Sequence, residues 1–231
     1  MEIQDICYTP IDAKTVENLN VDDVRAWVEE TVPQTHISGT IAKGAHNTLR
    51  SRYPWNICYA YLDRAGGWQN NFDVKFPELA DSFTSSFGLQ LSDISGVLLL
   101  PKNELFSGLG VWHSDPDIGG LRMYLENKNF EKNPLYYKKS KVARTGLNTL
   151  GTATDNDPRF HEEMHVCKIL KENQAFYLNN MQGVHSPFID SSCQRFAVII
   201  SAKNGDTSII EKTKQLIIDS AIKYKDYALI Y

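Results

Sequence analysis

The chain has 231 residues, of which 42% are hydrophobic, and this is enough to fill the core of one sizeable domain. Its 24 Lys and Arg side chains are outnumbered by 28 Asp and Glu, which argues against nucleic acid as the main partner. No apolar run approaches the roughly 20 residues that span a bilayer, and the sequence starts without a signal-peptide pattern. We therefore expect a cytoplasmic protein with no membrane or nucleic-acid partner. The oligomeric state stays open.

The cysteines and the overall organisation point to one reduced, compact unit. The 4 cysteines are scattered and form no C-x-x-C pair, so neither a disulfide framework nor a thiolate zinc site is predicted. The sequence contains no internal repeat and no stretch rich in Pro, Gly and Ser that is long enough to be a linker. We expect residues 1–231 to form a single domain.

Residues 1–93 carry two helical signals separated by an aromatic-rich stretch. Asn20 can cap a helix whose apolar positions share one face. Pro77 opens a second helix, and Gly88 closes it. The segment is expected to form an N-terminal α/β cap.

From residue 94 onward, short β-type runs separated by turn residues replace the helical patterns. Residues 94–203 are therefore predicted to form a mainly β core, a small sandwich or barrel. Within it, residues 127–157 are long, polar and poor in apolar periodicity, which predicts a solvated loop, with closure over a substrate as one hypothesis. Residues 204–231 are expected to form a C-terminal helix across one face. The β-type runs are ISGVLLL, GVWH, LRMYLE, AFYLNN and RFAVIISA.

The segment GVWHSDPD places His113 and Asp115 two apart after an apolar run, so both point to the same side of an extended chain. His185, in the turn-like GVHSPF, is the best candidate for a third metal ligand, and Arg195 follows ten residues later. Two imidazoles and one carboxylate on one face of an octahedral ion make the facial triad of non-heme Fe(II) oxygenases. Asp117 is an alternative carboxylate with a different spacing.

This pattern, H-x-D followed much later by H and then R, resembles the Fe(II)/2-oxoglutarate-dependent oxygenases over roughly residues 95 to 203. The surrounding LRMYL and FYLNNMQGVHSPFIDSSCQRFAVII are most similar to the aspartyl/asparaginyl and proline hydroxylase branch. The resemblance implies a double-stranded β-helix (cupin-like jelly roll) core. It also makes His113, Asp115 and His185 the catalytic iron ligands.

The same resemblance suggests how the cosubstrate is held. It makes Arg195 the partner of the distal carboxylate of 2-oxoglutarate, for which a planar, always charged guanidinium is well suited. Arg122 and Tyr124 match positions that in relatives bind the cosubstrate or a substrate carboxylate. Ala197 stands where relatives often have a hydroxyl that assists the arginine, so a second contact must come from elsewhere, and Tyr124 is the candidate.

The activity implied is hydroxylation of an unactivated C–H bond, with release of succinate and CO2. The implied cofactors are Fe(2+), 2-oxoglutarate as cosubstrate and O2, with ascorbate as a stimulant. The branch resemblance favours a small-molecule substrate, a free amino acid or an amino-acid residue in a peptide.

A rival motif lies at residues 161–165, which read HEEMH. On a helix this pattern would place His161 and His165 around zinc, with Glu162 as the general base of a metallopeptidase. A distant ligand such as Glu211 would complete that site. The plainer interpretation is a surface turn that leads into a strand. A third possibility is a non-catalytic cupin-like domain that binds a ligand.

Overall fold

The structure is a computed structural model, and the description below is limited to part of the chain. The described residues are 1–12, 19–35, 58–61, 72–94, 96–101, 108–109, 112–114, 120–141, 152–190, 194–201 and 208–231.

Four helices and thirteen strands are assigned within the described residues, besides short 3-10 turns. The helices are α1 (Val21–Thr35), α3 (Phe72–Lys75), α4 (Pro77–Phe87) and α5 (Ser208–Lys223). The strands are β1 (Ile6–Ile11), β2 (Cys58–Tyr61), β3 (Gly96–Pro101), β4 (Gly108–Leu109), β5 (Trp112–His113), β6 (Leu121–Asn127), β7 (Leu135–Lys139), β8 (Thr152–Ala153), β9 (His165–Cys167), β10 (Ala175–Leu178), β11 (Gly183–Ile189), β12 (Arg195–Ser201) and β13 (Leu229–Ile230).

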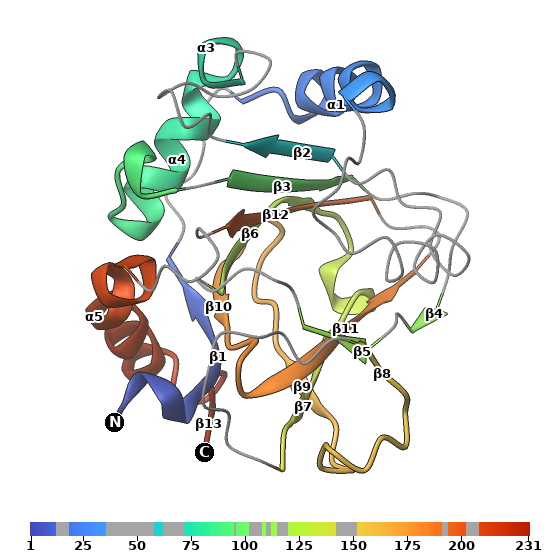
Figure 1. Cartoon of the computed structure of the whole chain (residues 1–231), viewed down its shortest axis with the longest axis vertical. Coiled ribbons are helices and arrows are strands. Elements are labelled where there is room, and N and C mark those ends of the chain that lie inside the picture. The colour runs from blue at the N-terminus through green and yellow to red at the C-terminus, as the bar shows by residue number, and fades with distance from the viewer. Residues whose placement is uncertain are drawn as a thin grey trace.

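The strands form two antiparallel sheets, with seven strands in the larger and six in the smaller across the described part of the chain. The larger sheet has the order β13-β1-β10-β6-β12-β3-β2, and the smaller has β8-β5-β11-β7-β9 with β4 beside β11. Figure 1 shows β1, β10, β6, β12, β3 and β2 stacked one above another, with the smaller sheet beside their lower half.

Eight strands alternate between the sheets in a nested order. β3 pairs with β12, β5 with β11, β6 with β10, and β7 with β9, so the first strand of the set meets the last and the pairing continues inward. This nesting is the strand order of a jelly roll, the arrangement of cupin-like domains. The expectation of a mainly β protein with flanking helices, one of them C-terminal, is confirmed.

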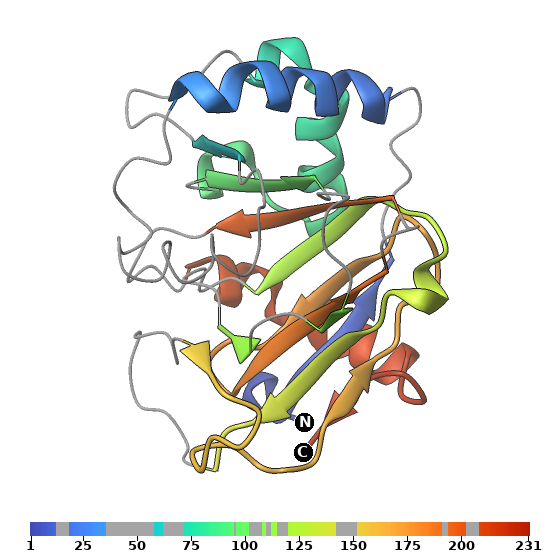
Figure 2. The same ribbon diagram turned by 90° about the vertical axis from the view of Figure 1, so that its right-hand side faces the viewer.

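The outer face of the larger sheet is covered by helices. Apolar side chains of α1, α4 and α5 join those of β6 and β12 in one buried cluster, which includes Trp27, Phe83, Ile217, Met123 and Val198. Figure 2 shows α1 across one end of the molecule, while α5 lies behind the lower strands. The helix signals in α4 are confirmed, because Pro77 is its first residue and Gly88 ends it in the left-handed region at φ 65°.

A second buried cluster fills the space between the sheets. It joins Tyr124 and Phe176 of the larger sheet to Leu135, Tyr137 and Cys167 of the smaller one. Side chains that share a face with these residues therefore point into the barrel, since alternate strand residues face opposite ways.

Four strands differ from the expectations in their presence or their place. β1 and β2 lie within residues 1–93 and extend the larger sheet, β1 as an inner strand between β13 and β10. The C-terminal helix ends at Lys223, and the chain returns as β13 along the edge of the same sheet. Residues 127–157 are not one loop, because β7 occupies Leu135–Lys139 and pairs on both sides.

The segment GVHSPF is a strand and not a turn. Gly183 lies within this strand, where the neighbouring strand β7 packs too closely for a larger residue. A Cβ at this position would lie 2.3 Å from the Lys138 carbonyl oxygen and 2.4 Å from Tyr137 Cζ. Pro187 is accommodated within β11 opposite Leu135.

Among the described helices, none is long and apolar enough to cross a membrane.

Candidate metal centre

The two predicted histidine ligands face each other across adjacent strands of the smaller sheet. His113 ends β5, and its Cα partner on β11 is His185. Their ring centroids are 4.4 Å apart with an interplanar angle of 48°. His185 is buried and His113 is half-buried. Paired residues in an antiparallel ladder point to the same face, so strand register alone brings the two imidazoles together.

This histidine pair points into the barrel. Tyr137 on β7 is the Cα partner of His185 on the other side, and Tyr137 belongs to the buried cluster between the sheets. The next strand continues the row, because His165 on β9 is the partner of Tyr137. Tyr137 was not predicted as a site residue because its strand lies in the stretch expected to be a loop.

The predicted carboxylate ligand, Asp115, lies outside the described residues, as does the alternative Asp117. Ser114 is described and buried, and it continues the chain from His113 toward Asp115. The structure therefore brings together two of the three predicted ligands and leaves the third as a prediction.

Arg195 lies at the start of β12 on the larger sheet and is 6% exposed. Its neighbours on β12 at 196 and 198 join the helix-facing cluster, so Arg195 and Ala197 face the barrel interior. The Arg195 guanidinium carbon is 5.9 Å from the centroid of the buried Tyr124 ring. Burial raises the pKa of the Tyr124 hydroxyl, and the Arg195 charge partly opposes that rise. The phenol is therefore a neutral hydrogen-bonding group beside a cation.

Arg122 also faces the barrel, opposite Ile199 on one side. Its Nη1 donates to the carbonyl oxygens of Gly120 at 2.9 Å and Leu178 at 3.4 Å. Gly120 has φ 64°, and a Cβ there would lie 2.5 Å from the Leu178 oxygen, so the backbone at this position requires glycine. The backbone thus fixes one edge of the Arg122 guanidinium.

The residues present fit a divalent metal of intermediate softness. Neutral imidazole nitrogens bind Zn, Cu, Fe and Ni, and each metal–nitrogen bond is about 2 Å long. Rings 4.4 Å apart at their centroids can direct one nitrogen each toward a shared ion. The pair sits on two paired strands, and the buried Arg195 and Tyr124 lie on the opposite sheet.

The HEEMH zinc motif is not on a helix. Residues 161–164 are irregular, and His165 begins strand β9. The His165 Nε2 atom is 3.6 Å from a Glu163 carboxylate oxygen and in contact with the Tyr231 hydroxyl. The prediction of two histidines on one helical face is therefore wrong, because β9 pairs with β7 and holds this segment extended. The interpretation as a turn leading into a strand is the correct one.

Comparison with known proteins gives no sequence relative. No family model and no curated protein matches the chain. Solved structures do match. The epimerase SnoN in complex with Fe3+, alpha ketoglutarate and nogalamycin RO is 13% identical with a TM-score of 0.40, covering 90% of this chain and 86% of that one. The non-heme monooxygenase ThoJ in its apo form is 12% identical with a TM-score of 0.42, covering 96% and 98%. These scores are low, so the fold assignment rests on the strand pairing described above.

Proposed function

We propose that the protein is an Fe(II)- and 2-oxoglutarate-dependent oxygenase that hydroxylates an unactivated C–H bond of an amino-acid-like or peptide substrate. The observation that carries the proposal is the His113–His185 pair, with its rings 4.4 Å apart inside a jelly-roll barrel. The H-x-D motif adds Asp115 as the third ligand. When bound, iron and 2-oxoglutarate would supply O2 activation with release of succinate and CO2.

In this proposal the larger sheet holds the cosubstrate. Arg195 would bind the distal carboxylate of 2-oxoglutarate through its planar donor fork, and Tyr124 would add a hydroxyl donor from the adjacent strand. Both groups are buried on the face of the larger sheet that is turned toward the smaller sheet. Burial strengthens a charge-assisted hydrogen bond, because less water competes for it.

Arg122 has a different task in the proposal. One edge of its guanidinium is occupied by the Gly120 and Leu178 carbonyl groups, which orient the side chain. The group would then present its charge to a carboxylate of the cosubstrate or of an amino-acid substrate. A fixed cation of this kind positions the substrate, and positioning accounts for much of an enzyme's rate enhancement.

The test is anaerobic addition of Fe(II) and 2-oxoglutarate, followed by absorption spectroscopy. The proposal predicts a metal-to-ligand charge-transfer band that His113→Ala, Asp115→Ala and His185→Ala each abolish. His161→Ala is the matched control and should leave the band unchanged, since His161 is exposed and outside the barrel row. A wild-type protein that binds iron without this band would instead be a non-catalytic metal-binding domain. Succinate release in a screen of amino acids and short peptides would then identify the substrate.

A further inference from the structure

The row of side chains on the inner face of the smaller sheet continues from the histidine pair to the surface. Tyr137 is the Cα partner of both His185 and His165, and such partners have Cβ atoms about 4.5–5.5 Å apart. The Tyr231 ring meets His165 edge-on, with centroids 5.4 Å apart and an interplanar angle of 87°. Tyr231 is 44% exposed, so the row connects the barrel interior to solvent.

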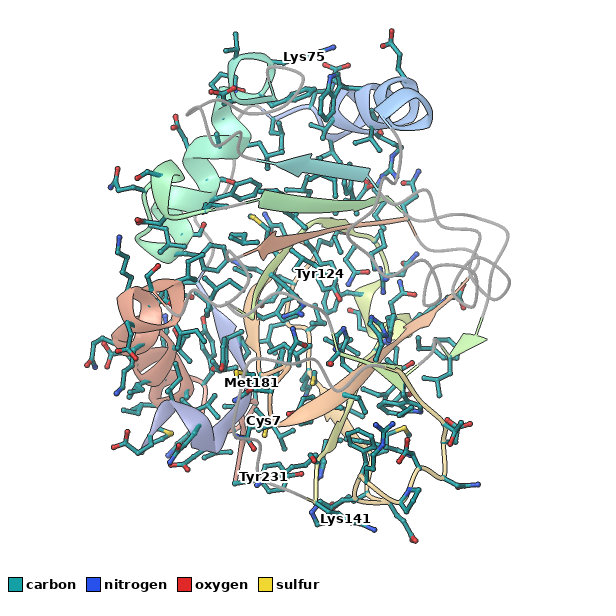
Figure 3. All side chains as sticks on the ribbon, in the orientation of Figure 1. Cys7, Lys75, Tyr124, Lys141, Met181 and Tyr231 are labelled. Carbon is teal, nitrogen blue, oxygen red and sulfur yellow. The ribbon has the colours of Figure 1, made fainter. Side chains whose placement is uncertain are left out.

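The far end of this row is distant from the region that holds the cosubstrate groups. Figure 3 shows Tyr124 near the middle of the molecule and Tyr231 near its lower end, close to Cys7. Figure 1 places both termini at this lower end. The backbone N–H of Tyr231 donates to the Asp5 carbonyl oxygen at 2.9 Å, which fixes the residue beside β1.

We propose that this row conducts oxidising equivalents away from the metal pair and that Tyr231 is the residue oxidised at its outer end. This part rests on the proposed function: bound iron and 2-oxoglutarate would supply a one-electron oxidant when no substrate is consumed. The phenol–imidazole pair of Tyr231 and His165 is a feature of the chain itself and can be tested without metal.

In this proposal an oxidised Tyr137 takes an electron from the next ring in the row and does not persist as a radical. Its hydroxyl donates to the Asn179 carbonyl oxygen at 2.9 Å. A carbonyl group does not take up a proton at neutral pH. An oxidised Tyr137 that keeps its proton is a strong oxidant toward the next ring.

Among the contacts of the described residues, Tyr231 has a basic proton acceptor, whereas the Tyr137 hydroxyl meets a carbonyl oxygen. The Tyr231 hydroxyl contacts His165 Nε2, and a Glu163 carboxylate oxygen lies 3.6 Å from that nitrogen. The Lys139 ammonium lies 3.9 Å from the Tyr231 ring centroid and disfavours a ring that is positively charged. Loss of the electron is therefore coupled to loss of the proton.

One electron would leave Tyr231 for a one-electron oxidant supplied by the bound metal, while the phenolic proton moves to His165 Nε2. On this chain the products would be a neutral phenoxyl radical and an imidazolium, and the metal would take up the electron. A one-electron reductant from solution, of the ascorbate class, returns the electron to Tyr231, and His165 returns the proton.

The first test uses the metal-free full-length chain, a ruthenium photosensitiser with a sacrificial acceptor, and electron paramagnetic resonance of the frozen sample. At limiting oxidant we expect a tyrosyl signal that Tyr231→Phe removes and His165→Gln weakens. Tyr227→Phe is the matched control, since Tyr227 is also exposed and its ring faces the Lys168 ammonium; it should leave the signal intact. An unchanged signal in Tyr231→Phe, which keeps the ring but not the hydroxyl, would overturn the assignment.

The second test asks whether the row connects the metal pair to Tyr231. Fe(II), 2-oxoglutarate and O2 are mixed without substrate, and the radical is measured in the wild type, Tyr137→Phe and Tyr231→Phe. The proposal predicts that both variants lose the Tyr231 radical while Tyr231→Phe keeps the anaerobic charge-transfer band. An equal Tyr231 radical in Tyr137→Phe would overturn the path. Absence of the band in the wild type would refute the proposed function. The metal-free test would still show whether Tyr231, next to His165, is the tyrosine that is oxidised.

Discussion

His113 and His185 are opposed residues on β5 and β11, and their rings lie 4.4 Å apart because of the register of those two strands. Neither imidazole is on a described loop. A ligand pair fixed by a ladder of backbone hydrogen bonds is preorganised, so metal binding needs little rearrangement of this part of the site. The variants that test the account therefore include changes to strand packing as well as changes to the ligands.

Replacing Arg195 should weaken 2-oxoglutarate binding far more than it changes iron binding. Truncating one partner of a buried, hydrogen-bonded charge pair costs about 2–5 kcal/mol, which corresponds to an affinity loss of at least about thirtyfold. Arg195→Lys should recover only part of the loss, since an ammonium lacks the planar fork. Calorimetric titration of the iron-loaded protein measures both constants.

The control for this titration is Arg159→Ala. Arg159 is half-exposed and pairs with Asp157 at 2.6 Å on the surface, where it holds the pKa of that carboxyl at about 2. Removing it should leave the 2-oxoglutarate affinity unchanged. If Arg159→Ala and Arg195→Ala weaken the affinity equally, a general loss of positive charge is responsible and the assignment of Arg195 fails.

Gly183→Ala should destabilise the barrel and disturb the site together. The added Cβ would lie 2.3 Å from the Lys138 carbonyl oxygen, which is backbone and cannot swing away. Overpacking of this kind typically costs about 1–3 kcal/mol, and here it displaces Tyr137, the neighbour of His185. Urea unfolding measures the free-energy loss, and the charge-transfer band measures the effect on the site.

Gly88→Ala is the control that separates a loss of stability from a disturbance of the site. Gly88 has φ 65° with nothing within 4 Å of an added Cβ, so the variant carries only the left-handed backbone cost of about 1–2 kcal/mol. It should lower stability and leave the charge-transfer band as in the wild type. A normal band in Gly183→Ala would contradict the role given to strand packing beside His185.

Stability should fall in alkaline solution because of buried thiol and phenol groups. Burial raises the pKa of Cys167 well above its usual value, so this thiol stays neutral in the folded state while the unfolded chain ionises above about pH 8.5. A raised folded pKa gives full stability below the unfolded pKa and a loss as pH rises beyond it. Each such group lowers the free energy of unfolding by about 1.4 kcal/mol per pH unit in that range. Tyr8, whose pKa burial also raises, adds its own loss above about pH 10.

Urea unfolding at a series of pH values from neutral to alkaline checks this slope. Cys167→Ala removes one titrating group and should make the alkaline slope shallower. Val184→Ala is the control, because it removes buried volume without an ionisable group and should lower stability equally at all pH values. Identical slopes for both variants would show that Cys167 does not carry the effect.

Much of the β core was predictable from apolar runs, and the helix of Pro77–Phe87 from its first proline and its closing glycine. The strand β7 was missed because its two lysines conceal the alternation of inward- and outward-facing side chains that is typical of a strand. Lys138 faces outward with its ammonium 4.8 Å from the Trp112 ring centroid, while Tyr137 faces the barrel, so the alternation is real but carries few apolar letters. Pairing of β1 with β10 joins residues more than 160 positions apart, and no local pattern encodes it.

The candidate site was predictable to the extent that its motif was local. His113 and Asp115 stand in one tripeptide, whereas the proximity of His185 depends on the register between β5 and β11. HEEMH is also a local motif, but its helical interpretation was wrong because pairing of β9 with β7 holds His165 in a strand. The contact between His165 and Tyr231 joins two segments that no sequence pattern links.

X-ray absorption spectroscopy of the anaerobic Fe(II)-loaded protein tests the central claim most directly. The account predicts imidazole scattering from His113 and His185 on one ferrous ion, reduced in His113→Ala and in His185→Ala and unchanged in His161→Ala. An iron spectrum without imidazole ligands, or one that neither barrel histidine variant alters, would contradict it.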